Sequence, residues 1–499
     1  MCSISCLMQQ GNQDDRLGDL PDSILLTILD RLNVQQVARI SVLSRRWRQL
    51  PAMLSRLRIS FLDLQPRVTA DIPQTNALVA EATKSMLGRR DSRRNTIQFL
   101  CINFFLILDD CISIGHSVGH TMATQNVEIA EFTIYAQGRN GDDRVNHGRR
   151  FMLFFDACPG AFGGLTFLHI QNLSFGESDI SNVLSTCKRL KRLRMFNCGP
   201  GNCTILQVEH SQLTELDIVW CYFERVVLNS LPKLTRIAFE GWIPFEDPIN
   251  CGYVPLLEAV GLTNVGLSWH KMVESSKFLG DNISVRELKL QFDWEKIWVQ
   301  PEYLAKRLPY VFRQLRFLNL AQIPEGYDLT WALFILQAAP NLKELYMTVY
   351  FHLTETYTDA DESRELSCSE VKGVVNWESS ASDFQHHNLA TLTIFGFQFE
   401  DYMVSYVRRV VKAAAKLQDV FLYDKLACRN SNVGVPVPSR SPFTEEQQSS
   451  AKERITERIN SSARIHFPTR AIIPLGSLDL PAARVNAQPS LIASKLAMV

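Results

Sequence analysis

The sequence lacks an excess of charge of either sign and lacks a long hydrophobic run. Its 499 residues contain 52 Lys+Arg and 52 Asp+Glu. A protein dedicated to binding nucleic acid normally carries a basic excess, so we predict no nucleic-acid partner. The most apolar stretch, residues 99–108, is far too short to span a bilayer and is followed by Asp109 and Asp110. We therefore expect no membrane partner.

Paired cysteines and a secretory leader are also missing. The twelve cysteines are scattered, and none forms a C-x-x-C pair, so the spacing predicts neither a zinc ribbon nor a redox motif. Residues 1–10 lack the basic segment and sustained apolar core of a signal peptide. Scattered cysteines without a leader indicate reduced thiols inside the cell. We expect the cytoplasm, the nucleus or both as the location.

Sequence patterns that mark enzymes are absent as well. There is no P-loop, no G-x-G-x-x-G opening a helix and no G-x-S-x-G. His116 and His120 have the spacing of a zinc-protease helix, but Ser117 stands where that motif needs its glutamate base. We therefore predict a chain that is not an enzyme and uses no cofactor and no metal.

Three short helices are predicted within residues 15–60. The stretch Leu20-Pro21-Asp22 opens the first, since proline and an acidic residue both favour a first helical turn. Asn33 with Gln36 resembles a capping box, and Ser44 can cap a third helix that carries Trp47. A module of this size has too little interior to bury all its large apolar side chains. Some must face a partner or, as an equally open alternative, the rest of the chain.

These residues resemble an F-box. The resemblance rests on Leu20-Pro21-Asp22-Ser23-Ile24-Leu25 followed by Val42-Leu43-Ser44-Arg45-Arg46-Trp47-Arg48. In that family the module docks on a Skp-type adaptor, which joins it to a cullin and a RING subunit. The resemblance implies an adaptor-binding face, carried over by position, that comprises Leu20, Pro21, Ile24, Ile28, Leu32, Val42, Leu43, Trp47 and Leu50. Leu50-Pro51 replaces the Leu-Trp of many plant members, which puts the end of the third helix in doubt.

From about residue 96 onward, the pattern apolar-x-x-apolar-x-apolar returns again and again. Copies begin at 165, 190, 213, 234, 257, 285, 315, 342, 389 and 417, with weaker ones at 97 and 129. From 165 to 342 the starts differ by 25, 23, 21, 23, 28, 30 and 27 residues, near the leucine-rich-repeat period of about 20–29. Cys198 and Cys221 follow two copies where that repeat takes Asn or Cys, which predicts a packing role for both.

Over most of its length the chain is similar to plant F-box/leucine-rich-repeat proteins, including those with an FBD-type C-terminus. This similarity implies an α/β fold, in which a small three-helix F-box is followed by an irregular leucine-rich-repeat solenoid with a curved parallel sheet. We expect the F-box at 15–60, a linker at 61–95 with a solvated basic cluster at 89–94, and repeats at 96–425.

The C-terminal part holds an insertion, a cap and a tail. Residues 355–385 contain eight Asp/Glu and two Lys/Arg, which predicts an acidic loop, with contact to a basic target as a sharper alternative. In the predicted cap, 426–470, Thr444 and Gln447 indicate a capped helix to Asn460, and 464–468 a last strand. Residues 471–499 show no periodicity, and we expect a poorly ordered tail.

Repeat geometry predicts which side chains face the concave side of the sheet. Residues between the apolar positions should point there. This set comprises Phe167, His169, Arg192, Arg194, Phe196, Glu215, Asp217, Glu287, Lys289, Phe317, Tyr346, Phe395, Phe421 and Tyr423. Of these, Arg192, Arg194, Phe196, Phe317, Tyr346, Phe395, Phe421 and Tyr423 are the candidate target-binding residues. As an open alternative, loops or the C-terminal cap cover some of these residues.

The predicted function is recognition of a substrate protein for an SCF-type ubiquitin ligase. One end would bind the adaptor, and the repeats would hold a target protein near a separate ubiquitin-carrying enzyme. Two alternatives remain open at this point: a repeat scaffold that binds no adaptor, and a co-receptor that holds a small molecule in the same complex. The sequence identifies neither the target protein nor any ligand.

Overall fold

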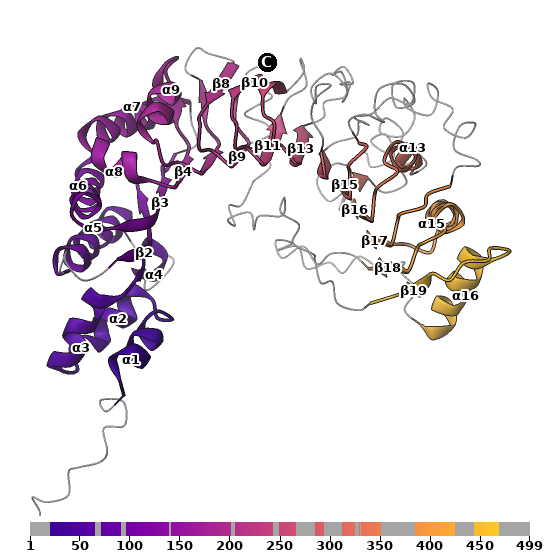
Figure 1. The fold of residues 1–499 in the computed structure, drawn as a ribbon, viewed down its shortest axis with the longest axis horizontal. Coiled ribbons are helices and arrows are strands. Elements are labelled where there is room, and N and C mark those ends of the chain that lie inside the picture. The colour runs from indigo at the N-terminus through magenta and orange to yellow at the C-terminus, as the bar shows by residue number, and fades with distance from the viewer. Residues whose placement is uncertain are drawn as a thin grey trace, which may run out of the picture. The chain divides into compact units, whose positions relative to one another are not determined.

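The computed structural model divides into two compact units, Met1–Arg194 and Met195–Val499. Figure 1 shows the helices and strands of both units. The structure describes residues 20–64, 71–90, 96–138, 141–200, 205–242, 249–265, 285–293, 312–324, 329, 331–350, 385–424 and 444–468. The predicted acidic insertion and the predicted tail lie outside these residues, apart from Gln385 at the end of the insertion.

The N-terminal unit begins with helices and continues as a parallel sheet covered by helices. Its helices are α1 (Asp22–Leu29), α2 (Val34–Ile40), α3 (Arg45–Gln49), the 3-10 turn η1 (Leu50–Met53), α4 (Phe61–Leu64), α5 (Ile72–Gly88), α6 (Leu108–Thr124), α7 (Gly141–Ala157), α8 (Pro159–Gly164) and α9 (Asp179–Thr186). Its strands are β1 (Arg56–Ser60), β2 (Ile97–Phe105), β3 (Val127–Tyr135), β4 (Phe167–Gln171) and β5 (Ser174–Phe175), and β6 (Arg192–Phe196) contains the division between the units.

The first three helices start where the capping residues predict. Asn33 and Gln36 form a complete capping box at α2, in which Gln36 N donates to Asn33 Oδ1 at 2.9 Å. The Ser44 hydroxyl accepts from Trp47 N at the start of α3. These side chains satisfy amide groups that a helix start leaves without partners. The predicted three-helix module is confirmed.

The predicted linker at 61–95 is wrong for the described residues. Helix α4 and helix α5 occupy most of this range, and α5 packs against α6. Arg90, predicted to be solvated, is buried, and its guanidinium donates to Leu54 O at 2.8 Å. The apolar face of α5 is made largely of Ala, Val and Thr, a weak pattern that did not predict a packed helix.

Strands β1 to β4 are parallel and adjacent in order, so the sheet begins at Arg56, well before the predicted start at residue 96. In Figure 1, α5, α6, α7 and α8 lie on one side of β2, β3 and β4. Between the two layers Phe104, Phe132, Phe154 and Phe162 pack with ring centres 5.0–6.4 Å apart, mostly edge to face. The weak repeat copies at 97 and 129 are offset from each other by two residues, because Ile97 pairs with Val127. Phe132 and Ile134 pair with Leu168 and Ile170, so the copy at 129 keeps the register of the copy at 165, although Ile129 is exposed.

The C-terminal unit contains a longer parallel sheet, a second parallel sheet of three strands, and few described helices. Its strands are β7 (Gly199–Pro200), β8 (Ile205–Glu209), β9 (Glu215–Val219), β10 (Arg225–Ser230), β11 (Arg236–Trp242), β12 (Ile249–Tyr253), β13 (Ala259–Val265), β14 (Glu287–Asp293), β15 (Phe317–Pro324), β16 (Glu344–Tyr350), β17 (Thr391–Phe395), β18 (Asp419–Tyr423) and β19 (Arg464–His466). Its described helices are α13 (Trp331–Ala338), α15 (Asp401–Ala413) and α16 (Glu445–Thr456).

The repeat pattern places equivalent residues side by side in this sheet. The second apolar position of each copy pairs with that of the next: Leu216, Ile237, Val260, Leu288, Leu318, Leu345, Leu392, Val420 and Ile465. All nine side chains are buried. Burial of one such side chain stabilises the fold by about 1.5–3 kcal/mol, so the row forms a continuous core. The predicted repeats and parallel sheet are confirmed.

The two cysteines at the repeat position have the predicted packing environment. Cys198 and Cys221 are both buried. The Cys221 thiol donates to the carbonyls of Met195 and Val219, each at 3.5 Å. Both cysteines therefore pack at the turn after a strand, as their place in the repeat predicts.

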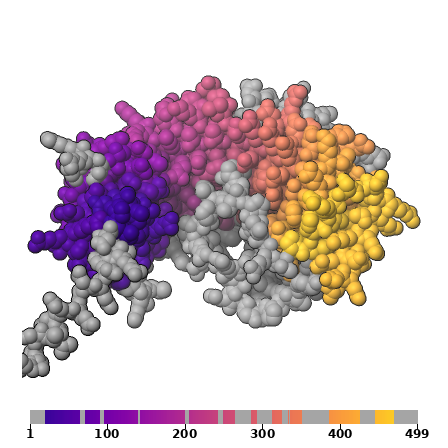
Figure 2. All heavy atoms as spheres, turned by 60° about the horizontal axis from the view of Figure 1, so that its bottom comes forward, coloured from indigo at the N-terminus to yellow at the C-terminus, as the bar shows by residue number. Residues whose placement is uncertain are grey.

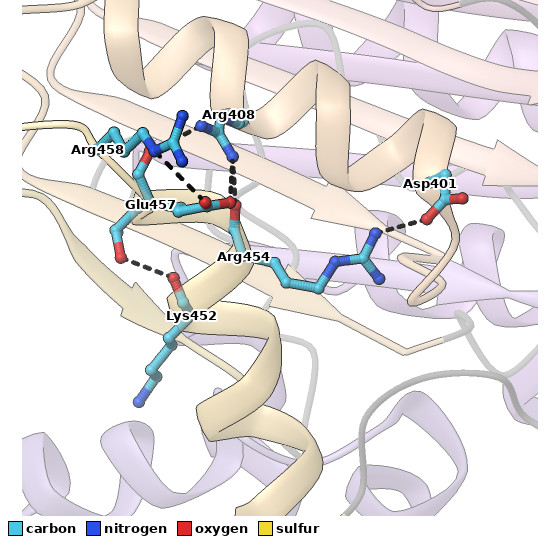
Figure 3. Close-up of polar contacts among 7 residues, drawn as sticks. Asp401, Arg408, Lys452, Arg454, Glu457 and Arg458 are labelled. Atoms are coloured by element: carbon cyan, nitrogen blue, oxygen red, sulfur yellow. Dashed lines mark hydrogen bonds and ion pairs between the residues drawn. The ribbon is translucent and has the colours of Figure 1, made fainter.

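The C-terminal cap is closed by a polar contact between α15 and α16. Arg408 on α15 donates to the carbonyl oxygens of Arg454 and Glu457 at 3.2 and 2.7 Å (Figure 3). Arg454 in turn donates to Asp401 at 2.5 Å. The predicted capping box of Thr444 and Gln447 is confirmed at the start of α16, and β19 adds to the sheet beside β18. In Figure 2 the yellow atoms of α16 and β19 lie directly against the orange atoms of α15.

Replacing Arg408 should loosen this cap. Arg408→Ala removes a cation and the donors that satisfy the last carbonyls of α16, so we expect the free energy of unfolding to fall by about 1–2 kcal/mol. Urea unfolding followed by tryptophan fluorescence measures this. Arg409→Ala on the same helix, where the described residues provide no polar partner, should change stability by less than about 0.5 kcal/mol. Equal effects of the two variants would contradict the assignment.

Candidate functional site

Within the described residues, the N-terminal three-helix module leaves several large apolar side chains exposed. Val42 is 71% exposed and Leu43 is 72% exposed, both in the turn between α2 and α3, and Ile24 on α1 is 47% exposed. Arg46, at the start of α3, donates to Asp22 Oδ1 and to Leu20 O, both at 2.6 Å. These contacts join the starts of α1 and α3, so the turn that precedes α3 lies at the same end of the module as Ile24. We call Ile24, Val42 and Leu43 the exposed apolar triplet.

The nine residues of the predicted adaptor face fall into three groups. Pro21, Ile24, Val42 and Leu43 are exposed, and Leu20, Ile28 and Leu32 are half-buried. Trp47 and Leu50 are 8% and 1% exposed, which corrects the prediction that they lie on this face. Leu50 opens the 3-10 turn η1, which packs against both α1 and α3, so the chain itself covers this interior. Trp47 and Leu50 therefore belong to the interior of the module and not to its exposed surface.

A second candidate surface lies on the sheet of the N-terminal unit, on the face away from its helices. The residues Glu131, Thr133, Tyr135, Phe167, His169, Gln171, Arg192 and Arg194 define this face, which we call the N-terminal ladder face. Arg192 forms an ion pair with Glu131, and its guanidinium lies 4.6 Å from the centre of the Phe167 ring. Of the two predicted binding arginines, Arg192 is thus already engaged within the chain. Arg194 has no carboxylate partner among the described residues.

The first strands of the C-terminal unit carry charged side chains that neutralise one another. Arg236 is buried between Asp217, at 2.8 Å, and Glu215, at 3.1 Å. Burial alone would lower the pKa of Arg236, but the two carboxylates outweigh it and raise that pKa. Glu215 and Asp217 were predicted to face the concave side, and in the structure both form ion pairs with Arg236 of the same chain.

Aromatic side chains gather on the last strands of the C-terminal unit. Phe317 packs on Tyr346 at 4.9 Å, Phe395 stacks on Tyr423 at 4.8 Å, and Phe421 stacks on His466 at 4.8 Å. Strand pairing explains the arrangement, because these residues lie at alternate positions that face the same side of the sheet. We call Phe317, Tyr346, Phe395, Phe421, Tyr423 and His466 the aromatic row.

The structure both extends and corrects the predicted aromatic patch. His466 was not among the predicted site residues, although it holds the same repeat position as Phe421, with which it pairs. That shared position was the signal for it. Phe317, Tyr346, Phe421 and Tyr423 are half-buried, whereas Phe395 is buried. Phe196, predicted for the other end of the surface, is buried too. Phe395 and Phe196 therefore offer no exposed area to a partner.

Acidic side chains border the aromatic row. Asp419 Oδ1 lies 2.7 Å from His466 Nε2, and Arg464 donates to its other oxygen at 3.0 Å. The hydrogen bond from His466 and the bond and charge of Arg464 outweigh desolvation and lower the pKa of Asp419. Tyr346 donates its hydroxyl to Glu344 at 3.0 Å, and burial together with this carboxylate raises the pKa of Tyr346. Carboxylates thus form hydrogen bonds with two members of the aromatic row, His466 and Tyr346.

Other histidines and acidic residues give no sign of a metal centre within the described residues. No group of three or more His, Cys, Asp or Glu side chains there could hold a metal ion. His386 is buried, with Nε2 2.9 Å from Ala339 O and Nδ1 accepting from Leu389 N at 3.0 Å. Its ring thus joins two backbone segments. Among the described residues, no helix has the length and apolar character that a membrane span requires.

Comparison with known proteins adds two family matches. Residues 17–58 match the F-box domain, and residues 156–459 match the leucine-rich-repeat domain of At1g61320/AtMIF1. The second match covers more than half of the chain and contains the repeats described above.

Several Arabidopsis thaliana proteins are similar over long stretches. The F-box/FBD/LRR-repeat protein At3g26920 is 24% identical over 350 residues, which are 68% of this chain and 75% of that protein. The F-box/LRR-repeat protein At3g26922 is 24% identical over 56% of this chain and 93% of its own length. The chain spans about half, 49%, of the FBD-associated F-box protein At5g22720, to which it is 23% identical.

The acid sensitivity of the last strands should depend on Asp419. A carboxyl group whose pKa is lowered by folding stabilises the fold above its unfolded pKa, near 3.8, and loses this effect as the pH falls through the lower folded value. We expect Asp419→Asn to lower the urea midpoint at pH 7 and the gap to the unmodified chain to shrink at about pH 3. Glu453→Gln, an exposed change on α16, should give no such gap. A gap that is equal at both pH values would contradict this account.

Proposed function

This chain belongs to the F-box/leucine-rich-repeat family represented by the At1g61320/AtMIF1 repeat domain, and we propose that it is the substrate-recognition subunit of an SCF-type E3 ubiquitin ligase. The F-box followed by leucine-rich repeats puts it in the class of F-box proteins that recognise substrates. The proposed direct partner is a Skp-type adaptor, and through it a cullin and a RING subunit. We propose the cytoplasm, the nucleus or both as its location.

The exposed apolar triplet is the single observation that supports adaptor binding most strongly. Val42 and Leu43 are adjacent, more than two-thirds exposed, and lie in the part of the chain that matches the F-box domain. Covering one such side chain contributes about 1.5–3 kcal/mol, so a partner that covered both would gain a substantial part of its binding free energy there.

In this proposal the chain works by proximity rather than by chemistry of its own. The F-box would fix it to the ligase, and the half-buried members of the aromatic row, Phe317, Tyr346, Phe421 and Tyr423, would hold the target protein. Half-buried aromatic side chains beside carboxylates are typical anchors of protein interfaces. The target's lysines would then meet the ubiquitin-carrying enzyme at high effective concentration. Ubiquitin transfer itself would belong to that separate enzyme.

Charging the exposed apolar triplet should release the adaptor. We expect Val42→Asp together with Leu43→Asp to weaken co-purification of a Skp-type adaptor by at least about tenfold, because two charges would be buried at the contact. Circular dichroism should remain unchanged, since both side chains are exposed. Leu62→Asp, at a leucine on α4 that is 63% exposed, is the matched control and should keep the adaptor. Normal adaptor binding by the double variant would contradict the assignment of this face, whereas absence of an adaptor from the unmodified chain would favour the scaffold alternative.

Changes in the aromatic row should separate target binding from adaptor binding. With the proteasome blocked, Tyr346→Ala together with Phe421→Ala should reduce the captured target proteins by about tenfold or more while the adaptor remains bound. The Val42→Asp, Leu43→Asp chain should show the opposite, with targets retained and the adaptor lost. Quantitative mass spectrometry of both pull-downs measures this. Targets captured equally by both variants and the unmodified chain would contradict the proposed place of binding.

A further inference from the structure

Three polar atoms at one corner of the N-terminal ladder face are enclosed and have no hydrogen-bond partner among the residues that the structure describes. They are Nε2 of His169, Oε1 of Gln171 and Nε of Arg194. His169 and Gln171 are two residues apart on β4, so their side chains leave the sheet on the same face. Arg194 lies on β6, which joins β4 through the hydrogen bond from Arg192 N to Thr166 O at 3.0 Å. We call His169, Gln171 and Arg194 the polar corner.

Such a group of atoms is unusual in a folded chain. Enclosed polar atoms lose their hydration, and nearly all of them recover it through hydrogen bonds within the protein. His169 is only 6% exposed, so its unpaired nitrogen destabilises the fold as long as nothing binds there. Three such atoms on neighbouring strands indicate a place where another molecule supplies the missing partners.

The polar corner carries one positive charge. Burial lowers the pKa of His169 to about 3, and the nearby charge of Arg194 lowers it as well, so the ring is neutral near pH 7. Arg192, on the same strand as Arg194, is already neutralised by Glu131. Arg194 therefore provides the charge that a ligand would meet.

Aromatic rings flank the polar corner. The Tyr135 ring centre lies 6.0 Å from that of His169 at an angle of 62°, and the Phe167 ring centre lies 6.5 Å away. Apolar rings around a few polar atoms suit a short side chain that has methylene groups below a polar end.

We propose that the polar corner binds the side-chain carboxylate of a glutamate or aspartate in the target protein. One carboxylate oxygen would accept from Arg194 Nε, and the other from His169 in the tautomer that carries its hydrogen on Nε2. Gln171 Oε1 would accept a backbone N–H of the same peptide. Arg194 is half-buried, so its side chain can turn outward to admit the ligand. This inference rests on the proposed function, in which the repeats hold a target protein.

A carboxylate fits the charge of the polar corner better than a phosphate does. One carboxylate neutralises one arginine, whereas a phosphate dianion would leave a charge without a partner in an enclosed place. Its two oxygens also match the two unpaired nitrogen atoms. The sharp test is therefore a comparison of glutamate with its neutral isostere glutamine.

Selection of random dodecapeptides on the full chain, co-expressed with a Skp-type adaptor, tests the proposal. We expect the selected peptides to share an acidic residue at a fixed position. A synthetic peptide from this set should bind about tenfold more weakly to Arg194→Gln, and its Glu→Gln version should bind both chains equally weakly. Arg149→Gln, at an exposed arginine of α7, should bind like the unmodified chain. Selected peptides without an acidic residue, or no selected peptide at all, would overturn the proposal.

His169→Leu provides a second, independent readout. Because it removes an enclosed nitrogen that has no partner, we expect this variant to unfold at a higher urea concentration and yet to bind the acidic peptide more weakly. A role in packing alone predicts a lower urea midpoint and an unchanged affinity for the peptide. A lower midpoint with unchanged peptide affinity would therefore contradict the proposal.

Two controls distinguish a target-protein carboxylate from a small carboxylic acid, and distinguish failure of this inference from failure of the proposed function. N-acetylglutamate alone should not compete at the concentration at which the whole peptide does. If it competes equally, the polar corner serves a small carboxylic acid, and its assignment to a target protein is wrong. Adaptor co-purification is measured in the same samples: if the adaptor is retained without any acidic preference, only this inference fails, whereas loss of the adaptor from the unmodified chain refutes the proposed function.

Discussion

The fold depends on the in-register pairing of short strands whose apolar residues cannot be buried by one repeat alone. Each strand contributes two or three inward side chains, and only the neighbouring strand completes their enclosure. In the C-terminal unit this pairing joins Leu216 to Ile237 and continues, repeat by repeat, to Ile465. The same register sets the opposite face, because side chains alternate along a strand. Core and candidate binding surface are thus two consequences of one constraint.

That constraint also explains why polar groups gather where they do. A row of equivalent positions brings together residues far apart in sequence, such as Glu131 and Arg192, or Asp419 and Arg464. Most charged side chains on this face find a partner within the row. In the polar corner, by contrast, Arg194 and His169 carry nitrogen atoms that the described residues leave unpaired. Internal pairing elsewhere makes this unpaired group stand out as a candidate for an outside ligand.

The C-terminal and N-terminal parts of the described chain differ in how far their own residues cover them. At the C-terminal end, β19 continues the sheet and α16 packs against α15. Arg408 donates hydrogen bonds to the carbonyl oxygens at the end of α16. At the N-terminal end, the helices cover Trp47 and Leu50 but leave Val42 and Leu43 in solvent. The C-terminal end is thus closed by residues of the chain itself, whereas the N-terminal module presents exposed apolar side chains.

The sequence by itself determined the features that depend on local pattern: the three N-terminal helices and their caps, the parallel repeats, the packing role of Cys198 and Cys221, and the capped helix of residues 444–456. Tertiary structure alone decided what depends on neighbours distant in the chain. It showed that residues 72–88 form a packed helix, that Trp47, Leu50, Phe196 and Phe395 are covered, and that His466 joins the aromatic row. Periodicity specifies which face a side chain takes, whereas its exposure depends on what packs above it, and that is set by contacts between residues tens to hundreds of positions apart.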